Sequence, residues 1–142
     1  MSVQVTPRPP YGAWLHPMTR TLDDWLRWQE ALHTREIDLG LHRVAAVADR
    51  LGVLGAPPPT LTIGGTNGKG SSAHLAASIY CEAGYRVGLY TSPHLRRYNE
   101  RVRVDESPAT DAQLCRAFEA VESARADTPL TYFEFGTLAA LW

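Results

Sequence analysis

Apolar side chains recur at the three- and four-residue spacing of an amphipathic helix in several stretches of this chain. Residues typical of helix ends bound these stretches. Thr21 and Thr110 stand where an N-cap is expected, and Gly52 and Gly84 stand where a helix commonly ends. The pattern therefore predicts helices over residues 22–32, 41–51, 72–83, 111–121 and 131–141.

Two short apolar runs are typical of strands instead. Residues 60–63 read Thr-Leu-Thr-Ile and residues 87–90 read Val-Gly-Leu-Tyr, on either side of the helix predicted over 72–83. Because a strand–helix–strand unit of about 30 residues joins parallel strands, we predict that the two runs lie in one mainly parallel sheet. Residues 101–104 alternate arginine and valine, as a half-buried or edge strand does. The chain is thus predicted to have an α/β fold.

The two ends of the chain differ from its middle. Four prolines within residues 1–20 predict an extended proline-rich arm, followed by one domain over residues 21–142. The last helical pattern is still apolar at Trp142, with no cap residue, glycine or proline after it. Because a doubly wound domain needs more than two parallel strands to cover its helices, we expect the domain to be incomplete at its C-terminus.

Composition and charge limit the possible partners. The formal net charge is -1, so no basic field favours nucleic acid or an anionic membrane. No apolar run approaches the roughly 20 residues that span a bilayer, and residues 1–10 lack the apolar core of a signal peptide. Cys81 and Cys115 have no metal-ligand spacing and are typical of a reducing compartment. We expect a cytoplasmic protein that binds neither nucleic acid nor membrane.

A glycine-rich segment containing Lys69 lies between the first predicted strand and the helix after it. Residues 65–71 read Gly-Thr-Asn-Gly-Lys-Gly-Ser. At a helix start the unpaired N–H groups and the dipole attract an anion, glycine lets the backbone approach it, and Lys69 adds a point charge. The strict P-loop pattern is not met, because Ile63 and Gly70 replace the required glycine and hydroxyl residue. The context still favours a phosphate cradle over a glycine-rich turn with a solvated lysine.

A second loop is predicted at the same edge of the sheet. Residues 91–94, Thr-Ser-Pro-His, follow the second predicted strand at its carboxyl end, which is where open α/β sheets bind ligands. We therefore expect both loops to face one site. Nearby arginines form a local basic cluster that is either a solvated face or a contact to an anionic substrate: Arg96, Arg97, Arg101 and Arg103.

Five segments carry a resemblance to a known family: residues 37–41 (IDLGL), 65–71 (GTNGKGS), 89–95 (LYTSPHL), 99–102 (NERV) and 131–134 (TYFE). In this order they resemble the folylpolyglutamate synthase and dihydrofolate synthase family of the Mur ligase superfamily. The T-S-P-H-L and N-E-R segments are the more specific ones, and Gly70 is the residue expected in that family. The resemblance covers nearly everything after the proline-rich arm.

The resemblance implies a three-layer P-loop-type ATP-binding domain, a following glutamate-ligase domain, and a monomeric ATP-dependent amide ligase. Such enzymes use the γ-phosphate of ATP to activate a carboxylate as an acyl phosphate, which the amine of L-glutamate attacks. The acceptor would be dihydropteroate, giving dihydrofolate, or a reduced folate, giving a polyglutamyl tail. ATP is then the co-substrate and Mg²⁺ the cofactor.

The resemblance also assigns nucleotide and metal residues. Lys69 would be the catalytic residue of the glycine loop. Ser92 would bind Mg²⁺, with the family's carboxylate and histidine ligands expected on segments after Trp142; the alternative for Ser92 is a turn residue before Pro93. The ATP-binding set is Thr66, Asn67, Gly68, Lys69, Gly70 and Ser71.

Two further segments are similar to pterin-contacting segments of the family. A carboxylate such as Asp38 or Glu134 suits the N–H groups of a pterin, and the ring of Tyr132 or Phe133 can stack on it. From the residues alone, Asp38 can equally organise a turn, and Thr131 with Glu134 can form a capping box. The full set is Ile37, Asp38, Leu39, Thr131, Tyr132, Phe133 and Glu134.

Other readings of the chain stay open. Residues 92–101 resemble a mobile substrate loop, in which arginines would meet a glutamate tail or a phosphate, or would simply be solvated. The chain can instead be a nucleotide-binding fragment without activity of its own, and we expect no ligase turnover from these 142 residues in isolation. A peptidoglycan Mur-type ligase is the other alternative, and the T-S-P-H-L, N-E-R and T-Y-F-E segments argue against it.

Overall fold

The computed structural model describes residues 20–32, 40–55 and 58–142. The predicted arm over residues 1–20 and the predicted pterin residues Ile37, Asp38 and Leu39 therefore lie outside the described residues, apart from Arg20. The helices are α1 (Leu22–Leu32), α2 (His42–Arg50), α3 (Lys69–Glu82), α4 (Asp111–Arg125) and α5 (Tyr132–Leu141), with one 3₁₀ helix, η1 (Tyr98–Arg101). The strands are β1 (Gly88–Tyr90), β2 (Val102–Val104) and β3 (Ser107–Pro108).

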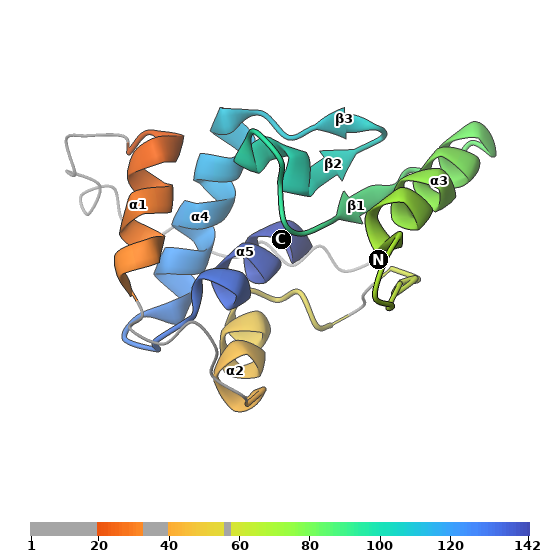
Figure 1. Ribbon diagram of the computed structural model, residues 1–142. Helices are drawn as coiled ribbons and strands as arrows, with labels where there is room; N and C mark the ends of the chain where they lie inside the picture. The colour runs from red at the N-terminus through yellow and green to blue at the C-terminus, as the bar shows by residue number, and fades with distance from the viewer. Residues whose placement is uncertain (1–19, 33–39, 56–57) are drawn as a thin grey trace, which may run out of the picture.

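Helices α1, α2, α4 and α5 pack together into one core on the side of the molecule away from α3 (Figure 1). Helix α4 contacts the other three helices of this group. At the centre of the core, the ring of Phe118 lies 6.0 Å from that of Trp25 and 5.8 Å from that of Phe135, between centroids. The fully buried side chains are Phe118, Phe135, Leu130, Leu138, Gln29, Val47 and Val121.

The helix ends confirm the predictions made from the caps. The hydroxyl of Thr21 accepts a hydrogen bond from the Asp24 N–H at 3.2 Å, and that of Thr110 accepts one from the Gln113 N–H at 3.2 Å. Gly52 and Gly84 follow α2 and α3 with φ of 72° and 86°, a conformation that glycine adopts without strain. These ends depend on neighbouring residues alone, so the sequence is sufficient to place them.

The described strands form one small antiparallel sheet in the order β1-β2-β3. Leu89 faces Arg103 in the first pair, and Arg103 faces Pro108 in the second. The strand predicted from the alternation of residues 101–104 is confirmed as β2, and it lies in the middle of the three strands. The strand predicted over residues 87–90 is confirmed as β1.

The parallel pairing predicted for residues 60–63 is not confirmed by the described residues. Residues 60–63 carry no strand assignment, and β1 pairs with β2, antiparallel. A parallel strand is normally buried on both faces of its sheet. Leu61 is instead exposed, so the run has neither a hydrogen-bonded neighbour nor a covering layer among the described residues.

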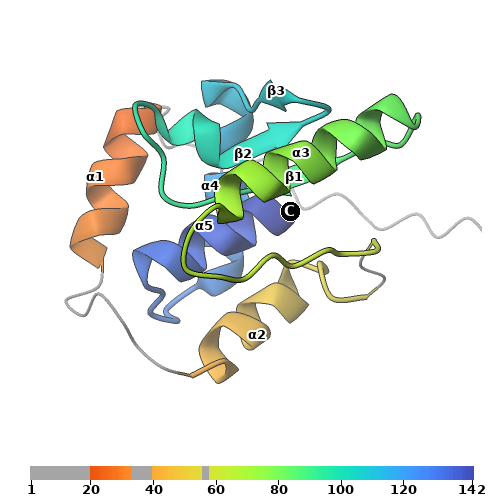
Figure 2. The ribbon, with the colours of Figure 1, turned by 45° about the vertical axis from the view of Figure 1, so that its right-hand side comes forward.

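Helix α3 lies beside β1 (Figure 2), and Figure 1 shows it apart from the helical core. Its buried residue is Ala77, whereas Leu75 and Ile79 are exposed. The glycine loop therefore enters a helix that the sheet supports from one side. None of the helices in the described part of the chain combines the length and apolar composition that crossing a bilayer requires.

Candidate functional site

The glycine loop ends in an open helix N-terminus. Gly68 is the N-cap of α3 with φ of 73°, and Gly65 has φ of 147°; both values favour glycine. No side chain caps this end of the helix, unlike the ends formed by Thr110 and Thr131. The N–H groups of the first turn of α3 are therefore available to an anion.

Lys69 is the first residue of α3, and its side chain folds back over the loop. Its Nζ donates to the carbonyl oxygen of Gly65 at 2.7 Å and to that of Thr66 at 3.1 Å. Both acceptors are neutral, and the loop and the lysine are exposed. The ammonium is thus held at the mouth of the loop by acceptors that an anionic oxygen can replace.

The loop after β1 is shaped by Glu100. Its carboxylate accepts hydrogen bonds from the backbone N–H groups of Leu95, Arg96 and Arg97 at 2.8, 3.1 and 2.9 Å. These hydrogen bonds hold the pKa of Glu100 below its usual value, and the bond from the Leu95 N–H has the largest effect. Ser92 lies in this loop with an exposed side chain, joined to Pro93 by a cis peptide bond.

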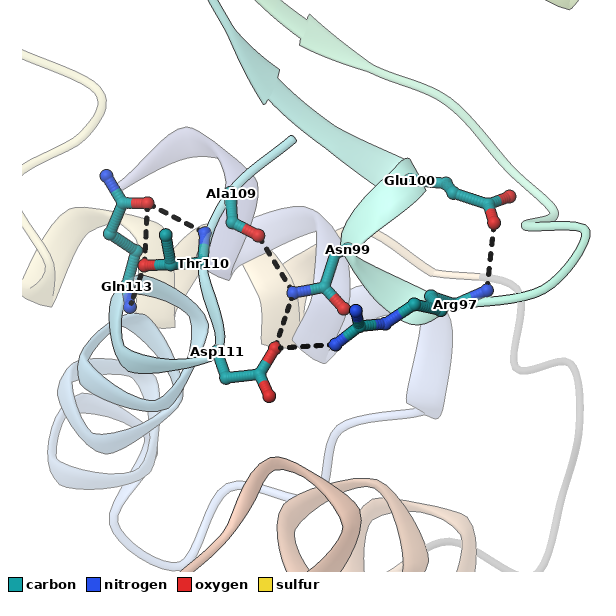
Figure 3. A network of polar contacts seen from close by, with 7 residues as sticks. All are labelled: Arg97, Asn99, Glu100, Ala109, Thr110, Asp111 and Gln113. Atoms are coloured by element: carbon teal, nitrogen blue, oxygen red, sulfur yellow. Dashed lines mark hydrogen bonds and ion pairs between the residues drawn. The ribbon is translucent and has the colours of Figure 1, made fainter. Parts of the chain in front are cut away.

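Asn99 anchors the same region to α4 (Figure 3). Its buried side-chain amide donates to the carbonyl oxygen of Ala109 and to Oδ1 of Asp111, both at 2.8 Å. Arg97 also pairs with Asp111, at 3.4 Å, on an exposed surface. Asn99 and Glu100 of the N-E-R segment therefore have structural tasks, and Arg97 belongs to a solvated ion pair.

The start of α5 is a capping box, as the alternative interpretation of Thr131 and Glu134 proposed. The Thr131 hydroxyl accepts from the Glu134 N–H at 3.2 Å, and Glu134 Oε2 accepts from the Thr131 N–H at 2.8 Å. Glu134 also pairs with Arg43 of α2, whose Nη2 lies 3.1 Å from Oε1. Arg43 follows the segment 37–41 in the sequence, and Glu134 ends the segment 131–134. This ion pair therefore links Glu134 to the residue that comes shortly after the other predicted pterin segment.

Phe133 and Tyr132 have different surroundings. Phe133 is 54% exposed, and its ring centroid lies 6.3 Å from that of Tyr90 at the end of β1. Tyr132 is half-buried against Tyr98 and Arg101, and burial raises its pKa. Phe133 is therefore the ring that is open to a flat ligand, with Tyr90 beside it.

Sequence reasoning missed Arg43 and Tyr90. Tyr90 is the last residue of a predicted strand at the ligand-binding edge, so its position gave a usable signal. Arg43 gave none, because its partner Glu134 is 91 residues away along the chain. In the described ranges no three histidine, cysteine, aspartate or glutamate side chains gather as metal ligands.

Comparison with known proteins connects this geometry to one family. The chain is 53% identical over 121 residues to the dihydrofolate synthase/folylpolyglutamate synthase of Escherichia coli K12, a match over 85% of this chain. It superimposes on the structure of E. coli FolC in complex with DHPP and ADP with a TM-score of 0.83 and 52% identity, over 89% of this chain and 31% of that one. The chain belongs to the dihydrofolate synthase/folylpolyglutamate synthase family.

Another member of the family was solved with Mn, AMPPNP and L-glutamate bound; its TM-score is 0.80 at 46% identity, over 88% of this chain and 30% of that one. Within this dihydrofolate synthase/folylpolyglutamate synthase family, the chain spans 29% of the E. coli relative and 28% of the one from Haemophilus influenzae. No protein-family model matches the chain. The fold of the described part is a helix-rich α/β domain of the kind found in these synthases.

Proposed function

We propose that this chain supplies the ATP cradle and part of the pterin site of an ATP-dependent amide ligase. The reaction would join L-glutamate to dihydropteroate, forming dihydrofolate, and to reduced folates, extending their polyglutamate tails. The observation that carries this proposal is the open N-terminus of α3, with Lys69 at its first position, in a chain 53% identical to the E. coli synthase.

The glycine loop would hold the triphosphate of ATP. Phosphate oxygens would replace the carbonyl oxygens of Gly65 and Thr66 as acceptors for the Lys69 ammonium. Phosphoryl transfer depends mainly on positioning and electrostatic stabilisation, which a glycine cradle with a fixed cation provides. The other contributors would be Asn67, Gly68, Gly70 and Ser71, through backbone N–H groups and, for Ser71, a hydroxyl.

In the proposed reaction the γ-phosphate passes to the carboxylate of the acceptor, which gives an acyl phosphate and ADP. The amine of L-glutamate then attacks the acyl carbon, an amide bond forms, and inorganic phosphate leaves with the C–O bond electrons. The exposed hydroxyl of Ser92 fits one oxygen position of a Mg²⁺ ion, whose charge would offset that of the phosphates. Its other ligands would be ATP, water and residues outside the described part of the chain.

The start of α5 would recognise the pterin. Phe133 would stack on the ring system, beside Tyr90. One carboxylate oxygen of Glu134 accepts the hydrogen bond of the capping box, and Arg43 contacts both oxygens. The orientation of the Glu134 carboxylate is therefore fixed before a ligand binds. Residues Ile37, Asp38 and Leu39, with Thr131 and Tyr132, would complete this side of the site.

We also propose that residues 60–63 become a strand of a mainly parallel sheet in a three-layer domain of the full-length protein. Strand β1 pairs with β2 alone among the described strands, so its other edge is open. The apolar, β-branched composition of residues 60–63 suits a strand that both layers of such a domain would cover.

Lys69 is the single lysine of the sequence, which permits a direct test of the cradle. Amines would be acylated at a limiting reagent concentration, and the extent of modification would be followed by peptide mass spectrometry. ATP should slow the acylation of Lys69 Nζ and leave the N-terminal amine unaffected, whereas adenosine, which lacks phosphates, should protect neither. Equal acylation of Lys69 with and without ATP would contradict the cradle.

A chimera tests the reaction itself. Residues 21–142 would replace the aligned segment of the E. coli synthase, and phosphate release would be measured with and without dihydropteroate and L-glutamate. We expect release that depends on both substrates and is lost when Lys69→Ala is introduced. A well-folded chimera that binds ATP and releases no phosphate would refute the proposal that this segment serves a ligase.

A further inference from the structure

Arg101 is a half-buried cation that no carboxylate of the described residues neutralises. Its Nε donates to Nδ1 of His94 at 2.9 Å, and its guanidinium carbon lies 5.2 Å from the ring centroid of Tyr98 and 5.5 Å from that of Tyr132. All three neighbours offer neutral groups. Several other arginines are paired with acids, as Arg125 is with Glu122.

The guanidinium of Arg101 has unused donors. It carries five N–H groups in a planar fork, and the bond to His94 uses the one on Nε. The terminal nitrogens make no hydrogen bond to the part of the chain that the structure describes. The two tyrosine rings and the histidine fix the fork in place, so its remaining donors are oriented before any ligand binds.

The position of Arg101 joins the two halves of the proposed site. Its carbonyl oxygen accepts a hydrogen bond from the Thr91 N–H at 2.8 Å, which places its backbone beside the loop that carries Ser92. Its side chain lies over Tyr132, the first residue of α5 and the neighbour of Phe133. The cation therefore stands between the proposed metal loop and the proposed pterin surface.

We propose that Arg101 binds the carboxylate of the pteroate or folate acceptor, the group that receives the phosphoryl group; this rests on the proposed function. The reaction brings two anions together, the acceptor carboxylate and the γ-phosphate, so a cation between them offsets their repulsion. The planar fork of arginine matches a carboxylate through two parallel hydrogen bonds. Asn99 and Glu100 of the same segment are used within the fold, which leaves Arg101 as its ligand-binding member.

The test compares dihydropteroate with its carboxamide, which has the same shape and no negative charge. Binding to the chain would be followed by quenching of pterin fluorescence for wild type, Arg101→Gln, Arg101→Lys and the control Arg96→Gln, whose side chain is exposed. Wild type and Arg96→Gln should prefer the acid by about tenfold or more, the range expected for hydrogen bonds to a charged group. Arg101→Gln should lose this preference and keep its affinity for the amide, and Arg101→Lys should keep part of it.

Each other outcome contradicts a defined part of the argument. A preference that survives in Arg101→Gln, or an equal loss of affinity for both ligands, would overturn the proposal and leave Arg101 as a support for Tyr98 and Tyr132. Equal binding of acid and amide by wild type would also overturn the proposal for Arg101, but it would leave the proposed pterin site intact. If wild type binds neither ligand, the pterin site itself is wrong. Loss of ATP protection of Lys69 in Arg101→Gln, with the acid preference intact, would assign Arg101 to the nucleotide.

Discussion

Gly136 in the middle of α5 gives the sharpest prediction about how the site is held. A methyl carbon built on Gly136 would lie 2.6 Å from the hydroxyl oxygen of Tyr98 and 3.5 Å from that of Tyr90. Tyr98 cannot easily withdraw, because the residue is 3% exposed and its ring packs against Phe118 and Tyr132. Its hydroxyl also has no hydrogen-bond partner in the described structure. The substitution Gly136→Ala therefore tests this packing directly.

Two opposing effects decide the result. Replacing glycine by alanine inside a helix stabilises it by about 1 kcal/mol. Forcing a methyl group into a packed core costs about 1–3 kcal/mol, and a contact of 2.6 Å with an immobile ring belongs at the upper end of that range. We expect Gly136→Ala to lower the free energy of unfolding by about 1–2 kcal/mol.

The substitution Tyr98→Phe should reverse the sign. It removes a buried hydroxyl without a partner, so by itself it should be neutral or stabilising by about 1 kcal/mol. With the oxygen gone, Gly136→Ala gains the helix preference and fills the space, and should stabilise by about 1 kcal/mol. The coupling between the two sites is then about 2–3 kcal/mol, within the range for residues in contact.

Urea unfolding of the four proteins, followed by tryptophan fluorescence and far-ultraviolet circular dichroism, measures this cycle. The m-values should agree, so that the midpoints report stability. If Gly136→Ala costs the same free energy in the wild-type background and in the Tyr98→Phe background, the clash is not with the Tyr98 hydroxyl and the packing described for α5 is wrong.

Three further predictions follow from single contacts. Arg43→Met leaves the largely buried carboxylate of Glu134 without its ion pair, so it should lower the free energy of unfolding by about 1–3 kcal/mol and weaken dihydropteroate binding. Unchanged values in both measurements would contradict the proposed role of this ion pair between α2 and α5. Asn99→Ala removes hydrogen bonds to Ala109 and Asp111 and should cost about 1–3 kcal/mol in urea unfolding, whereas a loss within error would show that η1 does not need this anchor. Glu100 has a pKa below the ordinary 4.5, so its stabilisation is present above that pH and is lost as the pH falls through the lowered value in the folded state. Thermal melts should show less acid sensitivity below about pH 4.5 in Glu100→Gln than in wild type, and parallel pH profiles would refute this role.

The helices of this protein could be predicted from its sequence because their determinants are local. Thr21, Thr110 and Thr131 cap helices through bonds to residues three positions on. The left-handed conformation of Gly68 is equally local, although α3 begins at Lys69, before the predicted start at residue 72. The family that the sequence motifs resemble was confirmed by relatives and solved structures.

The tertiary structure decided which distant residues meet. The sequence predicted a parallel partner for residues 60–63, but pairing requires a neighbouring backbone and a covering layer, and the described sheet is antiparallel. The ion pair of Arg43 with Glu134 and the packing of Gly136 under Tyr98 join segments tens of residues apart. No local pattern encodes such contacts, because they depend on where whole helices come to lie. The same holds for Arg101: the sequence offered a cluster of four arginines, and only the fold placed this one between the loop of Ser92 and the start of α5, against two tyrosine rings.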